Sequence, residues 1–169
     1  YDTHHDNDTA PSSDDKGTAV YAVDIFDGSL VASFTGATYP LMTHAIPSDI
    51  TKVDINYNAV IDRLYVGDLA GQMWRFNVGN PDPASWAASF LFTGASGVKI
   101  FYPPDITLEW DFTTNGGYEM LFFGTGDREH PKDLTPDNRF YAVKDKSAGR
   151  ELTESNLYDV TTNELQQTG

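Results

Sequence analysis

Short apolar runs separated by turn residues recur along the chain from Thr18 onward. β-branched and aromatic side chains predominate in these runs, and Gly, Asp, Asn or Pro closes each of them. The pattern predicts strands over residues 19–24, 29–34, 64–67, 72–78, 89–93, 98–102, 120–124 and 139–144. We therefore predict an all-β fold.

The predicted strands also form a repeat. The strand that contains Tyr21 aligns with the strand that contains Tyr65, 44 positions later, and the strand that contains Phe122 follows after 57 more. A longer loop at residues 127–138 accounts for the wider second spacing. A period of about 40 to 50 residues, built of an apolar strand, a glycine turn and a second strand, is typical of β-propeller blades. We predict a partial β-propeller in which these three aromatic residues are equivalent; a β-sandwich with coincidental hairpins is the alternative.

About three blades are visible, whereas closed propellers contain about 4 to 8. We therefore expect the remainder of the parent propeller chain to be a partner of this segment. Within the chain we expect a polar loop or frayed start at residues 1–17 and the blades at residues 18–150. Residues 151–169 continue the chain without a clear structural pattern.

Charge and composition narrow the functional classes. The sequence contains 11 Lys and Arg against 25 Asp and Glu, a formal net charge of −14. Such a field repels phosphate backbones and anionic headgroups, so we expect no nucleic acid partner and no direct membrane insertion. No stretch approaches the ~20 apolar residues that cross a bilayer. Because cysteine is absent, disulfides, thiolate zinc sites and thiol nucleophiles are excluded.

The most specific local pattern lies between two of the predicted strands, at residues 54–62. Oxygen-bearing side chains occupy positions 1, 3, 5 and 9, and a main-chain carbonyl is available at position 7; the residues are Asp54, Asn56, Asn58, Asp62 and, for the carbonyl, Val60. This spacing lets one loop surround a hard cation with oxygens, so it predicts calcium rather than zinc or iron. Position 6 is Ala59 and position 12 is Tyr65, which departs from an EF-hand. With only two carboxylates in the loop, we expect a weak affinity of about 10⁻⁴ to 10⁻³ M.

A second interpretation of the same segment is a strand with one wet face. Val53, Ile55 and Tyr57 alternate with polar residues there, as they would in a half-buried strand. Asp and Asn are poor strand formers, however, and three of them in alternation are unusual. From spacing alone, the metal loop and the wet strand both stay open.

Six segments of the chain together resemble one known family. They are residues 46–49, the loop 54–62, the block 62–76 that begins Asp-Arg-Leu-Tyr-Val-Gly-Asp, and residues 123–131, 139–145 and 152–161. These segments resemble the C-terminal propeller of the PilY-type family, adhesin and biogenesis proteins at the tip of type IV pili. The resemblance covers nearly the whole chain.

The resemblance implies both a site and a role. It implies that the 54–62 loop is a calcium site that governs pilus extension against retraction. It also implies a non-enzymatic adhesin and assembly factor on the bacterial cell surface, exported through the periplasm and outer membrane, with minor pilins and a host or abiotic surface as partners. Family members more often have Asp at the fifth loop position and Gly at the sixth, so Asn58 and Ala59 bear on the affinity.

An enzyme is the alternative class. Residues 22–28 resemble the blade motif of pyrroloquinoline quinone dehydrogenases. That motif has Thr and Trp where this chain has Asp27 and Ala32, and the vicinal cysteines of many such enzymes are absent. We therefore favour a non-enzymatic protein.

Overall fold

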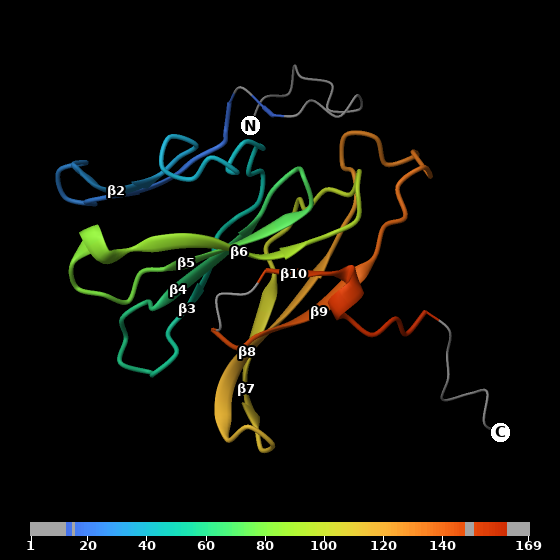
Figure 1. Ribbon diagram of the computed structural model, residues 1–169. Coiled ribbons are helices and arrows are strands. Elements are labelled where there is room, and N and C mark those ends of the chain that lie inside the picture. Colours follow the sequence, from blue (N-terminus) through green and yellow to red (C-terminus); the bar gives the residue numbers. More distant parts are fainter. Residues whose placement is uncertain (1–12, 15, 148–150, 162–169) are drawn as a thin grey trace.

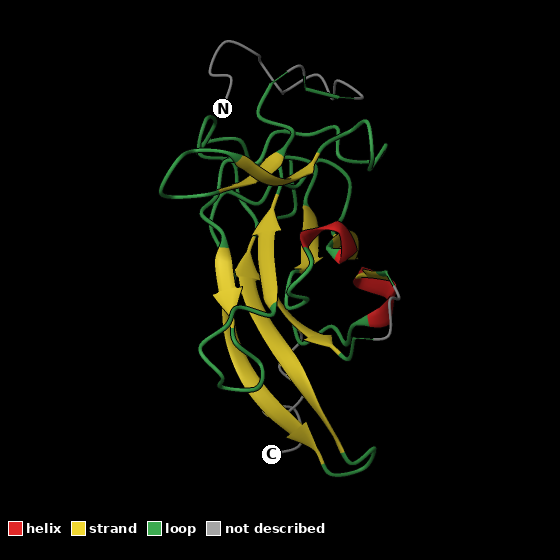
Figure 2. Ribbon diagram, turned by 90° about the vertical axis from the view of Figure 1, so that its left-hand side faces the viewer, coloured by secondary structure: helices red, strands yellow, loops and turns green. Residues whose placement is uncertain are grey.

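The chain folds into three separate antiparallel-based β-sheets in the computed structural model, which describes residues 13–14, 16–147 and 151–161 (Figure 1). The first sheet is a hairpin of β1 (Val20–Val23) and β2 (Leu30–Phe34). It lies against one face of the central sheet, and the third sheet lies against the other (Figures 1 and 2).

The central sheet is the largest of the three. Its strands β3 (Thr51–Val53), β4 (Arg63–Gly67), β5 (Gln72–Asn77) and β6 (Ala87–Thr93) are consecutive in sequence and pair antiparallel. The short strand β10 (Leu152–Thr153) adds to the outer edge of β6 in parallel. Four consecutive antiparallel strands are the composition of a propeller blade.

The third sheet consists of β7 (Asp105–Asp111), β8 (Gly116–Gly124) and β9 (Phe140–Asp145), again antiparallel. The described residues also form two single turns of 3-10 helix, η2 (Pro83–Ser85) and η3 (Glu154–Asn156). The described residues contain no α-helix, and they contain no helix long and apolar enough to span a bilayer.

Side chains alternate between the two faces of the central sheet, so its strands contribute to two hydrophobic cores, one on each face. On β4 the fully buried Tyr65 faces the third sheet, whereas its neighbour Val66 faces the first sheet. In the core next to the third sheet, the ring of Phe92 lies 4.8 Å from that of Tyr141. In the other core, the ring of Phe34 lies 4.8 Å from that of Phe76. Aromatic side chains therefore fill both spaces between sheets.

The predicted fold class is confirmed: the described residues are all-β, with three sheets and no closed barrel among them, compatible with a partial propeller. The strand predicted at residues 98–102 is wrong. Val98 and Ile100 are buried, but the backbone there bonds to separate loops, with Ile100 N–H donating to the Asp68 carbonyl and Gly126 N–H to the Lys99 carbonyl. The apolar side chains of this segment fill the core, but its backbone does not pair with a strand.

The strands β3, β7 and β10 were not predicted. On β7, polar residues such as Asp105, Thr107 and Glu109 dilute the apolar pattern, because only one face of this strand meets the core. The predicted polar start at residues 1–17 lies mostly outside the described residues, as does the end of the segment 151–169.

The predicted equivalence of Tyr21 and Tyr65 is wrong. Tyr21 is 60% exposed, and its neighbour Val20 packs into the core instead, whereas Tyr65 is fully buried. The two hairpin turns do correspond, since Gly28 and Gly71 both adopt a left-handed backbone, with φ of 75° and 71°. The local turn repeats, but the first hairpin presents its opposite face to the central sheet.

Candidate metal centre

The predicted metal loop is the connection between β3 and β4. Its stem is closed by the Asp62 N–H, which donates to the Val53 carbonyl over 2.9 Å. Ile55 packs against the core on the third-sheet side and Ile61 against the core on the first-sheet side. The tip is open to solvent, with Tyr57 81% exposed, and it projects to the lower left of Figure 1. The loop is thus held at both ends and free at its tip.

Asp54 organises the tip. Its Oδ1 accepts a hydrogen bond from the Asn58 N–H (3.2 Å), and its Oδ2 accepts one from the Ala59 N–H (2.7 Å). Asn56 Oδ1 also accepts from the Asn58 N–H (3.1 Å), and Asn58 Oδ1 accepts from the Val60 N–H (2.8 Å). The chain therefore turns back around the oxygens at positions 1, 3 and 5, and the wet-strand interpretation is wrong.

Two residues of the loop adopt a left-handed backbone without being glycine. They are Tyr57, with φ of 60°, and Ala59, with φ of 67°. For an L-residue this conformation costs about 1 to 2 kcal/mol. Ala59 stands at the position where the calcium loop pattern usually has Gly, so the structure explains physically why Gly suits that position.

Asp62, at position 9, closes the loop and ties it to the rest of the sheet. Its Oδ2 accepts a hydrogen bond from the Ile55 N–H (2.8 Å), and its carbonyl accepts from the Val78 (2.8 Å) and Gly79 (3.1 Å) N–H groups. A Cβ added at Gly79 would lie 2.5 Å from Asp62 Oδ1. Gly79 is therefore required for this placement, and no feature of the local sequence around it signalled the contact.

The residues fit a hard divalent cation. All the side-chain atoms that the loop offers to a metal ion are oxygens. Calcium prefers oxygen ligands, whereas zinc and iron favour nitrogen and sulfur. Within the described ranges no three His, Cys, Asp or Glu side chains gather into a metal-binding group. A cation at this loop must therefore depend on the two amides and the Val60 carbonyl besides Asp54 and Asp62.

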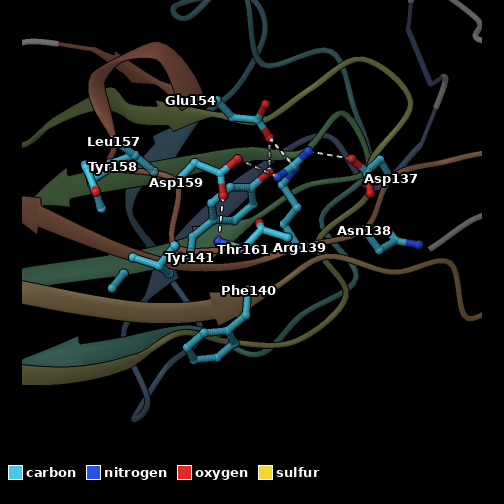
Figure 3. A pocket seen from close by; sticks show the side chains of 12 residues that line it. Asp137, Asn138, Arg139, Phe140, Tyr141, Glu154, Leu157, Tyr158, Asp159 and Thr161 are labelled. Carbon is cyan, nitrogen blue, oxygen red and sulfur yellow. Dashed lines mark hydrogen bonds and ion pairs between the residues drawn. The ribbon is translucent and has the colours of Figure 1, made fainter. Parts of the chain in front are cut away.

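A second hollow, of about 700 Å³, lies where β9 begins (Figure 3). Arg139 stands in it among three carboxylates, with Nη2 2.5 Å from Asp137, Nε 3.6 Å from Glu154 and Nη1 3.7 Å from Asp159. The Tyr141 hydroxyl donates to Glu154 as well. Arg139 Nε makes no hydrogen bond there, but the guanidinium is already paired with the surrounding carboxylates, and we assign the hollow no function.

Among solved structures, the chain is similar to the C-terminal domain of Pseudomonas aeruginosa PilY1, with a TM-score of 0.65 and 21% sequence identity. The match covers 82% of this chain and 34% of that chain, so this chain spans about a third of the length of its neighbour. The sequence matches no protein-family model and no curated protein. The predicted likeness to the PilY-type family is thereby confirmed as a likeness of fold.

Proposed function

We propose that this chain is a non-enzymatic propeller segment of a type IV pilus-associated adhesin and assembly factor, and that its 54–62 loop binds calcium. The observation that carries the proposal is the geometry of the loop. Its oxygens at positions 1, 3 and 5 are turned inward on a fold shared with the PilY1 C-terminal domain. From that likeness we also propose that the chain acts outside the cell, with minor pilins and a host or abiotic surface as its partners.

The chemistry that a bound calcium ion supplies is positive charge, which offsets the repulsion between Asp54 and Asp62 in a chain whose formal charge is −14. The loop residues do the rest. Asp54 holds the tip in a turn through Asn58 and Ala59, and Asp62 joins the loop stem to the end of β5. Calcium would therefore stiffen one edge of the central sheet, and we propose that this change regulates pilus extension and retraction.

The decisive experiment is a calcium titration of thermal or denaturant stability in the wild type and in Asp62→Ala. With a dissociation constant of about 10⁻⁴ to 10⁻³ M, calcium at about 10 mM should stabilise the wild type by about 1.4 to 2.7 kcal/mol. Asp62→Ala should lose this increment. Magnesium should give a much smaller one, because it demands a tight octahedron.

Asp49→Ala is the matched control. It removes one exposed negative charge shortly before β3 but leaves the loop intact, so it should keep the full calcium increment. Equal responses of the wild type and Asp62→Ala to calcium would refute the proposed site. Loss of the increment in both Asp62→Ala and Asp49→Ala would show that calcium only screens the net charge.

A further inference from the structure

The residue after Asp62 leaves the loop and enters the space between the central and third sheets. Arg63 begins β4, and its side chain is 13% exposed. Its Nη1 lies 2.6 Å from Oε1 of Glu119 on β8, and its Nη2 donates to the Ser147 hydroxyl over 2.6 Å. One guanidinium therefore contacts two segments of the third-sheet region, immediately beside a residue of the candidate metal loop.

The same interface contains a second acidic residue, Asp145 at the end of β9. Its Oδ1 lies 2.7 Å from Arg75 Nη1 and accepts the Ser147 N–H, and its Oδ2 accepts the Tyr65 hydroxyl over 2.8 Å. Arg63 Nη1 lies 3.8 Å from Asp145 Oδ2. Two arginines thus face two carboxylates, which makes the buried network neutral in charge.

Because the network is buried, its charged groups depend on one another as partners. The side chains of Glu119 and Asp145 are 3% and 2% exposed, so neither can exchange its arginine for water. Burial also raises the pKa of Glu119 above its ordinary value, and Arg63 opposes that rise. A displacement of Arg63 would leave a buried carboxylate without its partner, which is strongly destabilising.

The stem of the loop is held rigidly, so a movement of Asp62 would also move Arg63. Asp62 is fixed by three main-chain hydrogen bonds, through its N–H to Val53 and through its carbonyl from Val78 and Gly79. Because successive side chains on an extended chain point to opposite faces, Asp62 serves the loop while Arg63 serves the interface. A shift of the stem at one of these residues must move the other.

We propose that Arg63 and Glu119 are positioning residues that couple cation occupancy of the 54–62 loop to the packing of the third sheet on the central sheet. The inference rests on the proposed function, since it concerns regulation of the same loop. Coupling is reciprocal: a substitution at Glu119 changes cation affinity, and a bound cation tightens β8 and β9.

A matched ion pair lies elsewhere in the fold. Lys99 Nζ lies 2.6 Å from Asp127 Oδ2, with side chains 8% and 10% exposed, and it joins the 98–102 segment to the 127–138 loop. That pair is comparably buried and also joins segments far apart in the sequence, 28 positions against 56 for Arg63 and Glu119. It has no contact with the 54–62 loop or its stem, so Asp127→Asn reports the general effect of breaking a buried pair.

The test measures terbium luminescence in the full chain, with terbium as a hard-cation probe and Tyr57 in the loop as the sensitiser. Glu119→Gln should weaken terbium affinity, and calcium affinity by competition, by about 5-fold or more. Asp127→Asn should leave both affinities unchanged. In the wild type, calcium should slow hydrogen exchange of β8 and β9, and Glu119→Gln should abolish that slowing.

Equal affinities in the wild type and Glu119→Gln, or equal losses in Glu119→Gln and Asp127→Asn, would overturn the coupling while leaving the cation site intact. Absence of terbium and calcium binding in the wild type would instead refute the proposed function. If Glu119→Gln does not fold, Ser147→Ala serves in its place. It removes only the bond from Arg63 Nη2 and should weaken affinity by about twofold, and an unchanged affinity would count against the coupling.

Discussion

The connections at the two ends of β4 are both built around an aspartate, yet they differ in what that aspartate can do. In the turn between β4 and β5, Asp68 Oδ1 accepts the Ala70 and Gln72 N–H groups, each over 2.9 Å. Its Oδ2 accepts Trp74 Nε1 over 2.8 Å, and the residue has no exposed surface. In the loop between β3 and β4, Asp54 likewise accepts two N–H groups but remains partly exposed.

The difference shows that burial, not local hydrogen bonding, separates a structural aspartate from a candidate ligand. The protein fills the acceptor positions of Asp68, and burial raises its pKa to about 7 even though its three donors favour the charged form. Asp54 keeps access to solvent and therefore to a cation. The same turn chemistry closes one end of β4 and leaves the other end open.

The largest effect should be the difference in stability between two single variants, each of which removes one of these aspartates. Asp68→Ala leaves one buried and two half-buried donors without an acceptor and should reduce the free energy of unfolding by about 3 kcal/mol. Asp54→Ala in chelator should cost about 1 kcal/mol or less, because water can replace the lost acceptor. Denaturant unfolding of both variants measures the contrast, and equal losses would show that burial is not the deciding factor.

The effect of Asp68→Ala should also depend on pH. The folded protein retains the Asp68 proton up to about pH 7, whereas an unfolded chain releases it near about 4. The stability that Asp68 contributes is therefore full below about pH 4 and is lost as the pH rises through about 7. The penalty of Asp68→Ala should be larger at pH 4 than at pH 8, and a penalty that grows with pH would contradict the burial argument.

A smaller effect should follow from crowding the open loop at its stem. In Gly79→Ala the new Cβ would lie 2.5 Å from Asp62 Oδ1, so Asp62 must move. We expect a loss of about 1 to 2 kcal/mol in chelator, together with loss of most of the calcium increment. Gly126→Ala is the control, since a Cβ there meets nothing within 4 Å, and it should change stability by less than about 0.5 kcal/mol. Equal calcium responses in the two variants would separate Gly79 from the site.

The smallest effect should be opposite in sign at the two ends of β4. Ala59→Gly relieves a left-handed alanine, with φ of 67°, and should stabilise the chain by about 0.5 kcal/mol and raise calcium affinity a few-fold. Ala70→Gly lies in the closed turn, where the backbone is not left-handed, and should destabilise the chain by about 0.5 to 1 kcal/mol. Calorimetry of the two variants in chelator checks the signs, and a loss in both would show that Ala59 is not strained.

The sequence alone predicted the features that depend on neighbouring residues. The hydrogen bonds of Asp54, Asn56 and Asn58 each span 2 to 5 residues, so the spacing of polar side chains indicated a loop, although it left a strand with one wet face open as well. The glycine turn of the repeat was predicted for the same reason, because the left-handed backbone that Gly28 and Gly71 adopt is a local demand that glycine meets.

Only the tertiary structure decided how these local pieces face one another. A period of two along a strand places Tyr21 and Tyr65 on one of two faces but does not say which face meets the neighbouring sheet. The contact of Gly79 with Asp62 spans 17 positions, and the bond from Arg63 to Glu119 spans 56. Such contacts form when separate sheets pack together, and the burial that results leaves Asp68 closed within the fold while Asp54 stays open to a cation.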